Sequence, residues 1–135
     1  MIIYVSPQHN DYRLLGTLAY ADLGPLPSRI QLFSTAMPSD GGAAGVAPLV
    51  EIVLTEPAGA LVNGALVLTQ ADLSGDLIAL QGSALWGRWI NGNGSVVLDG
   101  NCTDESGTGF FKLSGTAGTL LYAGARAILG VTTLG

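Results

Sequence analysis

Short runs in which apolar and polar residues alternate recur along the chain from about Ile30 to Val131, separated by Gly, Pro, Asn and Asp. In the run 29–34, Ile30 and Leu32 point to one face and the polar residues beside them to the other, because side chains alternate across a strand. The pattern predicts β-strands. Further strands are expected at residues 49–55, 65–69, 77–90, 95–99, 110–113 and 119–129.

Glycine-containing motifs mark the turns between these strands. Asn63-Gly64 and Asn91-Gly92-Asn93-Gly94 hold residues that readily adopt positive φ, and the second motif predicts a hairpin between its flanking strands. Residues 37–48 are rich in Gly, Ala and Pro, show no periodicity and are predicted to form a loop. The segments 56–59 and 100–109 are predicted to be turns that lie outside the strands.

The fold class follows from the number and spacing of these strands. Many short strands, without a convincing helical period anywhere in the chain, are typical of an all-β protein. A length of 135 residues suits one domain. The sequence therefore predicts a single antiparallel β-sandwich or jelly-roll domain over residues 29–135, preceded by an N-terminal arm.

Residues 1–28 differ in composition from the rest of the chain. They contain the only histidine, three of the four tyrosines and the proline-rich segment 24–28. Proline fixes φ and removes a hydrogen-bond donor, so this segment is expected to separate the N-terminal part from the main body. Two interpretations remain open: a first strand over Arg13–Tyr20 followed by a linker, or an arm that docks on a neighbouring subunit.

The charge and cysteine content narrow the classes of partner. The net charge is −5 and only five Lys and Arg residues are present, so the sequence offers no basic patch for nucleic acid. No apolar stretch reaches the roughly 18 residues of a membrane helix, and the N-terminus does not resemble a signal peptide. Cys102 is the only cysteine, which fits a reducing compartment and an inert buried thiol.

The residues that usually build enzyme sites are scarce in this chain. One histidine and 11% charged residues leave little to cluster, and His9 is expected to be solvated. Most carboxylates fall at turns or strand ends, where turn chemistry explains them. The acidic stretch 99–105 does not have EF-hand spacing. We therefore predict no catalytic residue, no metal and no cofactor.

Two tryptophans are the strongest candidates for binding a sugar or another protein. Trp86 and Trp89 are three residues apart on one predicted strand, so they point to opposite faces, and one is expected in the core and the other exposed. An exposed Trp stacks on a sugar or anchors an interface; the alternative is that it covers a bend near Gly87. The candidate interaction residues are Tyr4, Tyr12, Arg13 and Trp89.

The order of the motifs from residue 29 to about residue 100 resembles that of a known family. The sequence letters that carry the likeness are RIQLF (29–33), the Gly/Ala/Pro loop, LVEIVL (49–54), PAG (57–59), NGALVLT (63–69), GSALWGRWI (82–90) and DG (99–100). This order resembles small virion structural proteins that are encoded by tailed bacteriophages and prophages. The resemblance implies a non-enzymatic, all-β component of the virion that is assembled in the bacterial cytoplasm. Residues 1–28 depart from the pattern.

The resemblance leads to two hypotheses about function. The first is a capsid decoration or minor head protein that acts as a symmetric oligomer, expected to be a trimer, and bridges subunits of the major capsid protein. The second is a tail or fibre accessory module that binds a host-surface glycan through Trp89 or tyrosine side chains. Neither hypothesis involves catalysis, nucleic acid or a membrane.

Overall fold

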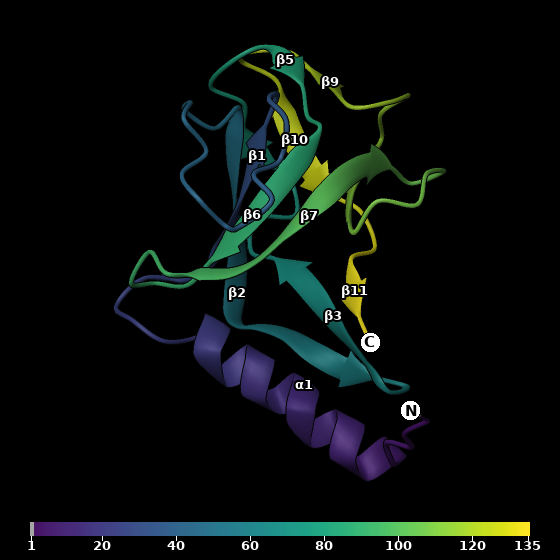
Figure 1. The fold of residues 1–135 in the computed structure, drawn as a ribbon. Coiled ribbons are helices and arrows are strands. Elements are labelled where there is room, and N and C mark those ends of the chain that lie inside the picture. The colour runs from purple at the N-terminus through teal and green to yellow at the C-terminus, as the bar shows by residue number, and fades with distance from the viewer. Residues whose placement is uncertain (1) are drawn as a thin grey trace.

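The computed structural model describes residues 2–135 and shows a mostly β protein with one helix, α1 (Pro7–Ala21), lying across one end of the sheet (Figure 1). The strands are β1 (Arg29–Phe33), β2 (Val50–Val62), β3 (Ala65–Gln70), β4 (Asp76–Leu77), β5 (Gly82–Ser83), β6 (Trp86–Ile90), β7 (Val96–Asp104), β8 (Phe111–Ser114), β9 (Leu120–Leu121), β10 (Arg126–Leu129) and β11 (Thr133–Leu134).

Helix α1 begins at a local signal in the sequence. Ser6 is the N-cap, its side-chain oxygen accepts a hydrogen bond from the His9 N–H at 3.1 Å, and Pro7 occupies the first helical position. Leu14, Leu18 and Ala21 then pack one face of the helix against the core. The prediction of a strand over Arg13–Tyr20 is therefore wrong, because the i, i+4, i+7 spacing of these three residues forms a helix face.

Nine of the strands form one sheet in the order β11-β3-β2-β1-β6-β7-β8-β10-β4, and β5 pairs separately with β9. Every pairing is antiparallel except that of β7 with β8, which is parallel. The sheet is thus mixed, and the expectation of a purely antiparallel sheet is wrong at this one pair.

The predicted strands are confirmed most closely at β1, β3 and the hairpin of β6 and β7, whose turn is the Asn91–Gly94 motif. The segment 37–48 contains no strand, as predicted. Other predicted strands differ in extent. The predicted strands 77–90 and 119–129 are each broken into shorter pieces, and β7 runs on to Asp104 through the predicted turn.

Strand β2 bends where a turn was predicted, and it continues through residues 56–59. Its register against β3 shifts between Leu54 and Gly59, which is the signature of a β-bulge. A Cβ at Gly59 would lie 2.2 Å from the Val67 carbonyl oxygen, so only glycine fits this close approach. Beyond the bend, β2 and β3 form the ribbon on which α1 packs (Figure 1).

The sheet curls so that its two ends meet, and one buried glutamine joins them. The Gln70 side chain, at the end of β3, donates to Asp76 Oδ2 at 2.7 Å and to the Ala127 carbonyl at 3.0 Å. Its Oε1 accepts from the Leu129 N–H at 2.8 Å. Asp76 Oδ2 also accepts from the Val53 N–H of β2 at 3.3 Å. These bonds link β2 and β3 to β4 and β10, and we call this group the Gln70 seam.

The curled sheet encloses a continuous apolar core. Its largest members come from the central strands and from β8; among them are Ile30, Leu32, Ile52, Trp89 and Phe111. A Cβ at Gly87 would lie 2.8 Å from the Phe111 ring and 2.9 Å from the Leu32 side chain. Glycine in β6 therefore lets the Phe111 ring lie directly against the strand, in the same core cluster as Trp89.

We predict that Gln70→Leu lowers the free energy of unfolding by about 2–4 kcal/mol. The substitution keeps most of the volume but removes the Gln70 partner of the Leu129 N–H and of the Ala127 carbonyl, and leaves Asp76 Oδ2 only its bond from the Val53 N–H. Each buried group that stays unsatisfied costs about 1–3 kcal/mol. Urea denaturation measures the change. Gln81→Leu is the matched control, since Gln81 is exposed, and should stay within about 0.5 kcal/mol of the original protein.

Candidate docking surface

The C-terminal end of α1 is fastened to the sheet by buried polar groups. Asn91, which is buried, donates from Nδ2 to the Tyr20 carbonyl at 3.2 Å, while its Oδ1 accepts from the Asn93 and Ser95 N–H groups, each at 3.0 Å. The C-cap residue Asp22 accepts from the Ala58 N–H at the bend of β2, at 3.0 Å. One end of the helix is thereby tied to both the β6–β7 turn and strand β2.

The proline-rich segment after the helix packs closely on the same turn. The Gly92 N–H donates to the Leu23 carbonyl at 2.9 Å. A Cβ at Gly24 would lie 2.5 Å from the Asn93 nitrogen, and a Cβ at Gly92 would lie 2.0 Å from the Leu26 oxygen. Two glycines thus permit backbone-to-backbone contact, so residues 22–28 hold the helix in place rather than spacing it from the body.

Large apolar side chains are exposed at this end of the molecule. Tyr4 is 82% exposed and Tyr12 is 67% exposed, and Arg13 is exposed beside Tyr12 on α1. Other exposed apolar residues nearby in the sequence are Ile2, Ile3, Leu15, Tyr20, Leu23 and Leu26. The structure therefore places three of the four candidate interaction residues in one N-terminal segment. We call residues 2–26 the N-terminal surface.

Trp89, the fourth candidate, is not part of any surface. It is 0% exposed and belongs to the apolar core, and Trp86 is only 1% exposed. The expectation that one of the two is exposed is wrong, because the outer face of β6 is also covered. The Phe33 ring stacks on Trp86 with centroids 4.6 Å apart, and the Arg88 guanidinium lies 5.3 Å from the Trp86 ring centre.

Arg88 explains how the outer face of β6 is covered. Its Nε and Nη2 donate to the two Asp99 carboxylate oxygens at 2.8 and 3.0 Å, and Nη2 also donates to the Gly42 carbonyl at 2.6 Å. The bond to Asp99 raises the pKa of Arg88 above its usual value. A largely buried, bidentate pair therefore holds the Arg88 guanidinium beside Trp86 and ties it to Gly42 of the loop 37–48, a link that period-2 reasoning cannot anticipate.

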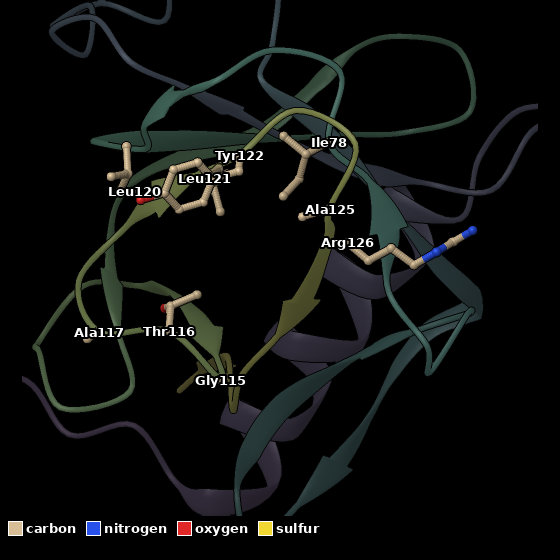
Figure 2. Close-up of a pocket in the computed structure, with 9 residues that line it drawn as sticks. All are labelled: Ile78, Gly115, Thr116, Ala117, Leu120, Leu121, Tyr122, Ala125 and Arg126. Atoms are coloured by element: carbon tan, nitrogen blue, oxygen red, sulfur yellow. The ribbon is translucent and has the colours of Figure 1, made fainter.

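An open cavity of about 380 Å³ lies at the opposite end, lined mainly by the segment that joins β8 to β10 (Figure 2). Ile78, Leu121 and Ala125 supply apolar walls, and Thr116 and the half-exposed Tyr122 ring lie at its rim. Figure 2 shows the Arg126 side chain pointing away from the opening, where its guanidinium donates to the Gly75 carbonyl at 2.8 Å. The cavity itself therefore offers an aromatic ring and a hydroxyl rather than a charge.

Asp104 shapes the segment that lines this cavity. Its Oδ1 accepts from the Ser106 hydroxyl at 2.7 Å, and its Oδ2 accepts from the Gly118 N–H at 2.6 Å. The Ser106 bond first, and then the Gly118 bond, holds the pKa of Asp104 below its ordinary value. This carboxylate of the acidic stretch 99–105 is thus engaged in fixing residues 115–118.

Few groups with reactive side chains remain beside these surfaces. Cys102 is buried, and burial raises the pKa of its thiol to about 12. His9 is exposed on α1. Within residues 2–135, no three His, Cys, Asp or Glu side chains gather into a group that could hold a metal ion. No helix of this part of the chain is both long and apolar enough to cross a membrane.

Comparison of the chain with protein-family models, curated proteins and solved structures finds no match. The resemblance to bacteriophage virion proteins therefore stays a prediction from the order of sequence motifs.

We predict that iodoacetamide at about pH 8 does not modify the folded protein. A thiol needs to be ionised to react, and an unperturbed Cys has a pKa of about 8.5. Burial raises the pKa of Cys102 to about 12, so its thiol stays protonated at this pH. Intact-mass measurement should show no adduct in buffer and one adduct in concentrated urea, where Cys102 becomes accessible. Rapid labelling of the folded protein would show that the core around Cys102 opens readily.

Proposed function

We propose that the protein is a structural component of a bacteriophage virion, a capsid decoration or minor head protein that reinforces the shell by bridging subunits of the major capsid protein. One observation supports this role: exposed large apolar side chains concentrate on the N-terminal surface, at one end of a tightly bonded β body. Exposed apolar patches of this kind mark contact with another protein.

In the proposed mechanism, the β body is rigid and the exposed residues that precede α1 bind the capsid. Residues 2–4, which are Ile2, Ile3 and Tyr4, precede the helix and are 73–100% exposed. Their burial against the shell would supply roughly 25 cal/mol for each Å² of apolar surface removed from water. Because Asn91 and Asp22 hold α1 on the sheet, force on the arm passes directly to the β body. The protein would then tie neighbouring capsid subunits together.

Two further features belong to this proposal. The sandwich or jelly-roll arrangement expected from the sequence is supported by the curl that brings β2 and β3 against β4 and β10. Assembly in the bacterial cytoplasm fits the single reduced cysteine, Cys102, which has no partner in the chain. The expected partners are the major capsid protein and further copies of the chain.

We predict that purified particles contain many copies of the protein on the head. Exchanging Ile2 and Ile3 for aspartate should remove the protein from particles, because two charges would be buried in an apolar contact. Leu73→Asp is the matched control, since Leu73 is 80% exposed on a distant turn, and should leave incorporation unchanged. Quantitative mass spectrometry of purified particles measures the copy number of each variant, and cryo-electron microscopy shows its position on the particle. A handful of copies confined to the tail would contradict the proposal.

A second candidate function has its own observation, the cavity beneath Tyr122. An aromatic ring at the rim of an apolar cavity suits the face of a neutral sugar. With Trp89 buried, Tyr122 is the side chain on which the glycan-binding alternative depends. The protein would then be a tail or fibre module that recognises a host-surface glycan.

If the glycan alternative holds, host-surface polysaccharide should bind saturably, and Tyr122→Ala should weaken binding about tenfold or more, since loss of one stacking contact costs about 1–2 kcal/mol. Isothermal titration calorimetry measures this. Tyr20→Ala removes another partly exposed ring, on α1, and should not change sugar binding. Equal loss in both variants, or no binding at all, would leave only the capsid role.

A further inference from the structure

We propose that the outward face of α1 is the contact between two copies of this chain, packed antiparallel about a two-fold axis at Gly16. The inference deepens the proposed structural role, on which it rests, by assigning the surface through which the protein self-associates. It favours a two-fold pair over the trimer expected from the sequence.

The composition of the outward face indicates that it is covered in the assembled protein. Tyr12, Gly16 and Ala19 lie on the side of the helix opposite Leu14 and Leu18, because each residue advances about 100° around the axis. Leu15 and Tyr20 flank them and are both 44% exposed. A solvated helix face normally carries charged residues, whereas Arg13 is the only formally charged side chain among the exposed residues of α1.

Gly16 has no role within a single chain. It lies in the middle of the helix, where glycine is less favourable than alanine, its φ is not positive, and a Cβ built on it meets nothing within 4 Å. A glycine at a helix crossing allows two helix axes to approach more closely, because the separation depends on the side chains at the contact. A second helix that crosses α1 at Gly16 would account for it.

The arrangement of residues around Gly16 points to a second copy as the occupant. Tyr12 and Tyr20 lie four residues before and four residues after Gly16. In an antiparallel pair related by a two-fold axis at residue 16, residue 16 − n of one chain faces residue 16 + n of the other, so each Tyr12 meets Tyr20 of its partner. A two-fold contact requires such self-complementarity.

The charges agree with the same packing. The chain carries ten acidic residues and a net charge of −5. The acidic residue within α1, Asp11, is partly buried and lies on the side of Leu18, because each residue advances about 100° around the axis. Two copies can therefore meet at the outward face without opposing carboxylates. The last turn of α1 contains no basic residue. In the antiparallel pair, Arg13 of one copy lies beside the last turn of the partner helix, where the carbonyl ends carry partial negative charge.

The first test is the association state of the purified full chain, measured by sedimentation equilibrium over a range of concentrations. We expect a monomer–dimer equilibrium that Gly16→Arg shifts toward monomer by roughly tenfold or more. The free space around Gly16 means that the variant keeps its fold, which circular dichroism checks. Ser39→Arg adds the same charge on the loop 37–48 and should dimerise normally. A monomeric or trimeric original chain, or equal dimerisation of both variants, would overturn the inference.

Gly16→Ala distinguishes an interface from a purely structural position. It should raise the thermal midpoint of the monomer, since alanine favours the helix, yet weaken dimerisation, because the added methyl groups separate the helices. A higher midpoint with unchanged dimerisation would contradict close approach at Gly16.

Cysteine cross-linking fixes the direction of the helices. Tyr12→Cys and Tyr20→Cys, mixed and oxidised, should give a disulfide-linked dimer, whereas each variant alone should not; Cys102 is buried and stays out of the reaction. Cross-linking of Tyr12→Cys with itself would show a parallel bundle and overturn the two-fold model. The composition of particles is measured separately from self-association. A chain that dimerises but is missing from virions refutes the capsid role alone. A chain that is monomeric but present in virions refutes the α1–α1 contact alone.

Discussion

Closure of the curled sheet is the constraint on which the rest of the structure depends, and one amide side chain provides much of it. Gln70 bonds to three groups from β4 and β10, so the ends of a nine-stranded sheet are held together. Only a closed sheet gives the core two sides, with Phe111 of β8 packed against Gly87 of β6. If the seam opened, β6 would lose the covering on its inner face.

Two other buried polar side chains act in the same way, each joining segments that are distant in the sequence. Arg88 ties the loop 37–48 to Asp99, and Asn91 ties the helix to the β6–β7 turn. A buried polar group is costly unless it is fully bonded, so these contacts favour one arrangement of the chain over others. The outcome is a body whose loops are fixed and whose apolar N-terminal surface is presented from a rigid base.

The sequence predicted what local chemistry determines and missed what tertiary contacts determine. The hairpin at Asn91–Gly94 was predictable from its turn residues. The burial of Trp86 was not, because the Phe33 ring and the Arg88 guanidinium pack against it on the outer face of β6. Similarly, the bulge at Gly59 and the parallel pairing of β7 with β8 depend on strands far along the chain. The Tyr122 cavity was missed for the same reason, since Ile78, which supplies one of its walls, comes from a distant segment that follows β4.

The missed helix has a different cause, and that cause bears on function. Ser6 and Pro7 mark its start and Leu14, Leu18 and Ala21 mark its buried face, so the signals for a helix were present. They were obscured because the outward face also carries apolar residues such as Tyr12 and Leu15, and amphipathic contrast is what reveals a surface helix. A helix lacks that contrast when both faces are buried. The property that hid α1 in the sequence is therefore the one expected of a helix packed between its own sheet and a second subunit.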